Sequence, residues 1–186
     1  MPVATQTIPC NFVGQFKVGD NLVFNVGLIR ALIAATDVGN LNKLIVIQAA
    51  AIVEAALQQI IWRAQNHYAE GVPNIAEADR AEIEKKTVDT FNVIIDVLKK
   101  HKVLDGLGAD IYDELHRLRK YRNKVHIQKP IEIPNVPADD DGAFSDGIRI
   151  WALGLNLRVL KHLSERFARP KQLTGYVGAL TVPSAQ

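Results

Sequence analysis

The segment between residues 115 and 128 carries the side chains that are best suited to catalysis or ligand binding. Within it, Arg119, Arg122 and Asn123 precede His126. An imidazole can take or give a proton near neutral pH, and a guanidinium can stabilise charge that develops on a phosphate. This set is suited to phosphodiester cleavage by transesterification. No carboxylate cluster for magnesium accompanies it, so we expect metal-independent chemistry and no cofactor.

The expected helix over residues 109–128 sorts these side chains by direction. Measured from Ile111, Arg122 falls at about 20°, inside the apolar stripe, while His126 and Arg119 flank it at about 60° and about 80°. Asn123 follows at about 120°. Three further cations point to solvent, where we expect contacts to phosphate or RNA: Arg117, Lys120 and Lys124.

Glu54 is the expected partner of the arginine on the buried face. It is the sole charged residue between Lys43 and Arg63, within an otherwise apolar run. A buried guanidinium keeps its charge and needs an acceptor, so we expect Glu54 to pair with Arg122 or Arg119. If the pair is buried, loss of Glu54 should cost about 3–5 kcal/mol. The alternative interpretation is that the pair only fixes helix register.

The other histidines and the tryptophans have simpler interpretations. A lone histidine beside an apolar stripe is more often a packing residue than a catalyst, and only the nearby arginines favour a chemical role for His126. We interpret the remaining histidines as surface residues: His67, His101, His116 and His162. Trp62 and Trp151 are interpreted as core or interface anchors.

The run LRKYRNKVHI, which follows TFNVIIDVLKK and a long helix with a glutamate in its apolar run, resembles the HEPN superfamily. The resemblance covers residues 21–168 in helix order, and its specific part is the short R-x4-6-H motif. It implies an α-helical bundle that forms homodimers. Many active members are metal-independent endoribonucleases of toxin–antitoxin, phage-defence or RNA-processing systems, so the resemblance also implies RNA or nucleotide ligands and an antitoxin or other protein partner.

The motif departs from the family pattern in two ways. Arg122 is followed by Asn123, as is usual, but only three residues separate it from His126. Arg119 has six intervening residues before His126, yet a lysine follows it. The tyrosine that some members carry two positions after the histidine, linked to modification by an antitoxin, is replaced by Gln128. The irregular spacing also fits a catalytically inactive module.

Apolar spacing predicts an all-α bundle of about five main helices and no sheet larger than a two-stranded ribbon, and the resemblance implies that this bundle is HEPN-like. An irregular N-terminal arm over residues 1–20 precedes the helical domain over 21–169, and a mobile C-terminal tail over 170–186 follows it. The expected helices cover residues 21–36, 40–68, 75–100, 109–128 and 145–168.

Composition points to a protein of the cytoplasm. The net charge of +2 is too balanced to identify a partner, and the single cysteine, Cys10, excludes an intrachain disulfide. The N-terminus lacks the pattern of a secretory signal. The most apolar run, residues 44–61, contains Glu54 and three glutamines, so we expect a buried helix and no membrane.

These observations leave three hypotheses. The first is an endoribonuclease that leaves a 2′,3′-cyclic phosphate, with His126 and Arg119 from two subunits meeting at a homodimer interface on the fourth helix. The second is an inactive HEPN-like module that binds a nucleotide, RNA or a protein. The third, a purely structural dimer, leaves the basic cluster without a ligand.

Overall fold

Five long helices form the body of the protein in the computed structural model, which describes residues 4–35, 38–66, 70, 72–73, 75–126 and 133–184. They are α1 (Phe16–Ile33), α2 (Asn42–Asn66), α4 (Phe91–Lys100), α5 (Ile111–Asn123) and α7 (Asp146–Arg166). Short elements lie between them: η1 (Gly39–Leu41), α3 (Glu77–Glu84), η2 (Asp105–Leu107) and α6 (Asp140–Ala143). The expected all-α bundle of about five main helices is confirmed.

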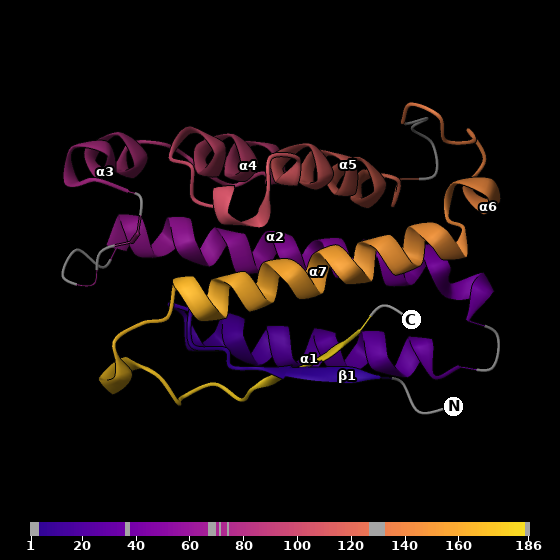
Figure 1. Ribbon diagram of the computed structural model, residues 1–186, viewed down its shortest axis with the longest axis horizontal. Helices are drawn as coiled ribbons and strands as arrows, with labels where there is room; N and C mark the ends of the chain where they lie inside the picture. The colour runs from indigo at the N-terminus through magenta and orange to yellow at the C-terminus, as the bar shows by residue number, and fades with distance from the viewer. Residues whose placement is uncertain are drawn as a thin grey trace.

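Helix α2 is the central element of the bundle. It contacts α1, α3, α4, α5 and α7. Figure 1 shows α3, α4 and α5 in a row along one side of α2, with α1 on the opposite side and α7 running alongside. Side chains around much of its circumference are buried, including Ile45, Val53 and Ile60 at 0% exposure. The helix is apolar and long enough to cross a membrane, but 61% of its most apolar window is buried, as in a core helix.

Helix α1 begins at Phe16, five residues before the expected start. The extra turn depends on α2, because the side-chain oxygen of Gln59 accepts a hydrogen bond from the Gln15 backbone N–H at 3.0 Å. Just before it, Gly14 lies against Trp62, where an added Cβ would come within 2.5 Å of the ring. Only glycine fits at this close approach.

The single helix expected over residues 75–100 is wrong, because α3 and α4 are separate helices. Thr90 has an extended backbone and its hydroxyl accepts a hydrogen bond from the Val93 N–H, which makes it the N-cap of α4. Between the two helices, Lys85 ends α3 and residues 87–89 have no regular structure. A threonine side chain that caps a new helix competes with continuation of the old one.

The two ends of the chain pair with each other. Strand β1 (Thr5–Ile8) and strand β2 (Leu180–Pro183) form an antiparallel ribbon in which Ile8 faces Leu180. Strand β2 also packs on α1 (Figure 1). Leu180 and Val182 are buried, at 0% and 1% exposure, so the expectation of a mobile tail is wrong for these residues. No larger sheet occurs in the described part of the chain, as expected.

Helix α5 is placed by a hydrogen-bonded connection to α4. The Tyr112 hydroxyl donates to the Leu98 carbonyl at 3.2 Å and accepts from the Leu104 N–H at 3.1 Å. It also lies 2.9 Å from a carboxylate oxygen of Asp105. These bonds fix the first turn of α5 against the end of α4, and the rest of α5 packs on α2.

Candidate active site on helix α5

Glu54 of α2 and Arg122 of α5 form the expected ion pair. The Nε atom of Arg122 lies 3.1 Å from Oε2 of Glu54. Glu54 projects from the middle of α2 and Arg122 from the last turn of α5, so the contact ties the central helix to the end of α5. The prediction of a direct pair is confirmed.

The burial expected for Arg122 is wrong. Its side chain is 40% exposed, whereas that of Glu54 is 16% exposed. The fully buried residues Leu115 and Leu118 lie earlier in α5, and the helix ends one residue after Arg122. The guanidinium therefore reaches out over the end of the core, and only the carboxylate is largely removed from water.

Burial shapes the ionisation of Glu54. Desolvation is the largest influence and raises the pKa of its carboxyl group, while the charge and hydrogen bond of Arg122 lower it. The net pKa lies above the ordinary value for glutamate. The pair thus keeps a carboxylate in a place that disfavours its charge, a pattern that is common at functional sites.

The chain after Asn123 tightens into a turn, so the helix expected to reach residue 128 ends earlier. The N–H groups of Lys124, Val125 and His126 donate to carbonyls three residues back, at 3.0, 3.2 and 3.4 Å. Such bonds correspond to about three residues per turn, which aligns position i with i+3. His126 follows this turn, and its side chain is exposed, whereas that of Asn123 is partly buried.

Arg119 lies one turn before Asn123, on the same side of α5. It is half-buried, and its Nε atom is buried without a hydrogen-bond partner among the described residues. Its charge reaches His116, where it is the second cause, after burial, of a lowered imidazole pKa. Arg119 and Asn123 therefore share one side of α5, and the exposed His126 follows the end of the helix.

Lys124 does not point to solvent, which corrects its assignment to phosphate or RNA. Its side chain is 5% exposed, and its ammonium donates to the Ala138 carbonyl at 3.2 Å and to Asp140 at 3.3 Å. Asp140 also pairs with Lys43 of α2 at 2.5 Å. The segment before α6 folds over this side of α5, and helix periodicity contains no information about that contact.

Arg117 and Lys120 lie on the opposite side of α5 from Arg122. The Arg117 guanidinium lies 4.7 Å from the ring centroid of Trp151, whose Nε1–H donates to Glu114 at 3.2 Å. Lys120 lines a groove with Arg117 and His116. Trp151 also packs on Tyr121 at 6.0 Å between ring centroids, which agrees with its interpretation as an anchor.

Several polar residues were misjudged or missed from sequence. His101 is buried at 7% exposure, so it is not a surface residue, while His116 and His162 are half-buried. His67 lies outside the described residues, as do Ile127 and Gln128. The buried set of Arg63, Glu70 and Arg169 was not anticipated, because its members are far apart in the chain and join only in the fold.

Among the residues that the structure describes, no group of three or more His, Cys, Asp or Glu side chains is arranged to hold a metal ion. No protein-family model matches this chain, and comparison with curated proteins and with solved structures likewise gives no match. The interpretation of the site therefore depends on its own geometry and on the motif.

Proposed function

We propose that this chain is a metal-independent endoribonuclease of the HEPN type. The observation that carries the proposal is the arrangement at the end of α5. There the exposed His126 follows Asn123 in a tight turn, four residues after the arginine that lies 3.1 Å from Glu54. An accessible imidazole next to fixed cations is the equipment that phosphodiester transesterification requires.

The reaction balances without water or metal. The 2′-hydroxyl of one ribose attacks the adjacent phosphorus, and its proton passes to a base. The bond from phosphorus to the 5′-oxygen breaks, and an acid gives a proton to that oxygen. The products are a 2′,3′-cyclic phosphate and a 5′-hydroxyl end. In this scheme His126 transfers a proton and Arg119 stabilises the charge on the phosphate, while Arg122 and Asn123 position them.

A homodimer follows from the need for two proton transfers. The motif contains one histidine, so a second imidazole would come from the motif of another copy. Val125, which precedes His126, is 48% exposed and offers an apolar contact at this edge. We therefore propose that the ends of two α5 helices meet, with a basic cleft between the two His126 side chains.

The test is cleavage of a single-stranded RNA pool in EDTA, with sedimentation equilibrium on the same preparations. We expect the wild type to cleave RNA and to sediment as a dimer at micromolar concentration. His126→Ala should lower the rate by about 10²–10⁴-fold, the usual contribution of a general acid or base. Substrate with 2′-deoxyribose at the cleavage site should not react, because the nucleophile is missing.

Lys161→Ala provides the control, because it removes an exposed side chain of α7 that lies outside the motif and outside the proposed dimer contact. It should retain most of the activity. Equal activity of the His126 variant, or a wild type that is monomeric and inert on a broad RNA pool, would reject the ribonuclease proposal. The second candidate, an inactive HEPN-like binding module, would then be favoured, since Arg117 and Lys120 line a groove that can hold an anion independently of His126.

A further inference from the structure

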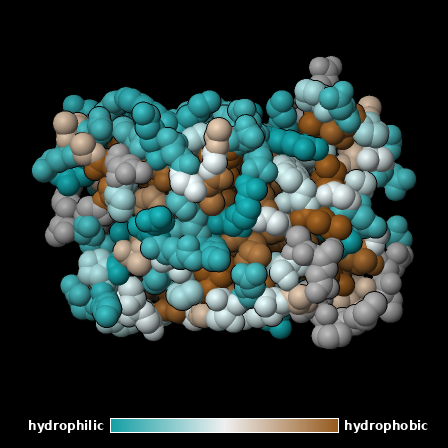
Figure 2. All heavy atoms as spheres, viewed as in Figure 1, coloured by the Kyte–Doolittle hydropathy of each residue, from teal (hydrophilic) through white to brown (hydrophobic). Residues whose placement is uncertain are grey.

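A groove of about 460 Å³ lies on the side of α5 that faces away from the Glu54–Arg122 pair. Side chains of α5 form one wall, and the segment that follows the connection after α5 forms the other. The lining residues are Asp113, His116, Arg117, Lys120, Ile133, Pro134 and Asn135. Figure 2 shows that the row containing α4 and α5 has a largely hydrophilic surface.

The groove contains two cations that form no ion pair among the described residues. Among the described residues, neither Arg117 nor Lys120 forms an ion pair, whereas Arg122, Lys124 and Arg158 each have an acidic partner. Arg117 is held in place by its stack on Trp151, at 4.7 Å. A pre-oriented guanidinium beside a lysine is a common arrangement for binding phosphate oxygens.

The second wall of the groove, formed by residues 133–135, can contact a larger ligand than phosphate alone. Ile133 is buried at 6% exposure, and Pro134 follows it, so one side of the groove is apolar. Asn135 has φ of 60°, a left-handed conformation that asparagine tolerates, and its amide can both donate and accept. The volume is within the range of about 300–1,000 Å³ that is typical for small-molecule sites, and inorganic phosphate alone would leave most of it empty.

His116 and Asp113 add hydrogen-bonding groups next to the cations. The His116 side chain is 27% exposed and its Nε2 lies 3.7 Å from Asp96 of α4. Burial, followed by the charge of Arg119, lowers the pKa of this imidazole, which favours its neutral form with one donor and one acceptor. The Asp113 carboxylate can accept hydrogen bonds from ribose hydroxyls.

We propose that this groove binds a nucleoside monophosphate unit. Arg117 and Lys120 hold the phosphate, Asp113 accepts from the ribose hydroxyls, and the base lies against Ile133 and Pro134. The unit can come from a free nucleotide or from one residue of an RNA strand. The proposal deepens the proposed function and rests on it only in the choice of RNA as the second source.

Position along α5 explains how an RNA strand could reach both sites. From Arg122 at about 20°, Arg119 lies at about 80°, His116 at about 140° and Lys120 at about 180° around the helix. On the helical wheel, the positive and hydrogen-bonding groups thus follow one another around α5. A strand held by one nucleotide in the groove would pass over Arg119 toward the motif edge.

The experiment measures binding and not cleavage. The probes are 5′-AMP, adenosine, and an unmodified four-nucleotide RNA, all titrated into the His126→Ala protein so that the RNA is not cleaved. Isothermal titration calorimetry should show 5′-AMP binding at least about tenfold tighter than adenosine, because charge-assisted hydrogen bonds to the phosphate exceed that factor. Much tighter binding of the oligonucleotide than of 5′-AMP would identify an RNA strand as the source, and similar affinities would identify a free nucleotide.

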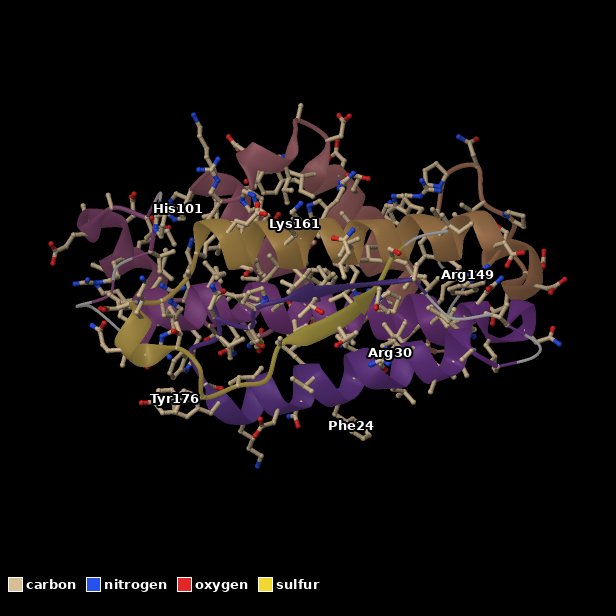
Figure 3. All side chains as sticks on the ribbon, turned by 60° about the horizontal axis from the view of Figure 1, so that its bottom comes forward. Phe24, Arg30, His101, Arg149, Lys161 and Tyr176 are labelled. Atoms are coloured by element: carbon tan, nitrogen blue, oxygen red, sulfur yellow. The ribbon has the colours of Figure 1, made fainter. Side chains whose placement is uncertain are left out.

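The double variant Arg117→Ala/Lys120→Ala should weaken 5′-AMP binding at least about tenfold. Its matched control is Lys17→Ala/Arg30→Ala, which removes the same two residue types from α1, on the far side of α2 (Figures 1 and 3). The control should keep wild-type affinity. Lys120→Glu serves as a second variant, because it leaves the Arg117–Trp151 stack intact.

Absence of binding by 5′-AMP and by the oligonucleotide at millimolar concentration would overturn the proposal, as would equal weakening in the control. The outcome is independent of the ribonuclease test. Nucleotide binding without RNA cleavage would leave the groove assigned and reject the catalytic proposal. RNA cleavage without nucleotide binding would support the catalytic proposal and reject the assignment of the groove.

Discussion

Glu54 is held where its surroundings oppose its own charge. Its side chain is 16% exposed, and its pKa is raised because burial outweighs the attraction of Arg122. An acid whose pKa is higher in the folded state than in the unfolded state makes the fold less stable once it ionises. This cost is present above the folded pKa and disappears as the pH falls below the unfolded value.

Glu54→Gln should therefore not destabilise the protein at pH 7. The amide removes the cost of ionisation and loses an ion pair whose arginine is well exposed, so we expect the free energy of unfolding to change by less than about 1 kcal/mol. As the pH falls from 7 to 4, the free energy of unfolding of the wild type should rise relative to that of Glu54→Gln. Urea denaturation across this range measures both.

Arg122→Gln is the opposite variant at the same contact. It leaves the Glu54 carboxylate without a cation, so it should destabilise at pH 7 and lose this effect at low pH. A large loss of stability in Glu54→Gln at neutral pH would show that the attraction of Arg122 outweighs the cost of burying the Glu54 carboxylate. The loss of about 3–5 kcal/mol expected for a buried pair does not apply, because Arg122 is 40% exposed.

At the scale of elements, Thr90 decides that two helices replace one. Its hydroxyl lies 3.5 Å from the Val93 N–H, and Phe91 immediately after it is buried at 3% exposure. The cap and the anchor together fix where α4 begins. Because α4 positions Asp96 beside His116 and supports α5, this boundary also affects the groove.

Thr90→Ala should lower the free energy of unfolding by about 0.5–1 kcal/mol, the lower part of the range for N-cap threonines, since the hydrogen bond is long. Thr87→Ala, an exposed threonine in the same connection, is the control and should have no effect. The measurement is the urea midpoint at constant slope. Equal effects of the two substitutions would show that the cap does not define this helix.

At the scale of the whole molecule, one buried ionic cluster joins distant parts of the chain. Arg169, after α7, binds Glu70 through Nε at 2.8 Å and donates to the carbonyls of Val13 and Gly14 at 3.2 and 3.1 Å. Arg63, at the end of α2, lies 3.6 Å from the same carboxylate and donates to the Phe167 carbonyl. One glutamate thus holds two arginines together with the N-terminal arm.

Glu70→Gln should destabilise the fold by about 3–5 kcal/mol, because it leaves two buried guanidinium groups with an incomplete set of acceptors. The side chains of Arg63, Arg169 and Glu70 are 2%, 5% and 7% exposed, so water cannot replace the lost charge. Glu77→Gln is the matched control, since Glu77 is 87% exposed in its pair with Arg80. A similar small effect in both variants, by denaturant unfolding, would show that the cluster contributes little.

The sequence by itself determined the helical class, the central apolar helix and the pairing of Glu54 with an arginine of α5. These follow from local information: hydrophobic spacing repeats every turn, and an isolated charge in an apolar run requires a partner. The start of α7 after Ser145 was likewise close to the expected position. The helical features depend on residues within a few turns of one another, whereas the pairing follows from the need of a buried charge for a partner.

Only the tertiary structure decided where the other polar groups lie. The burial of Lys124 depends on residues 138–140 folding back over α5, and the exposure of Arg122 depends on where the core ends beneath it. The ribbon joins residues 5–8 to residues 180–183, and the groove joins α5 to residues 133–135. Each of these features requires a contact between segments that are far apart in the sequence. The packing of the whole chain sets the relative positions of such segments, so periodicity along a single helix cannot predict the contact.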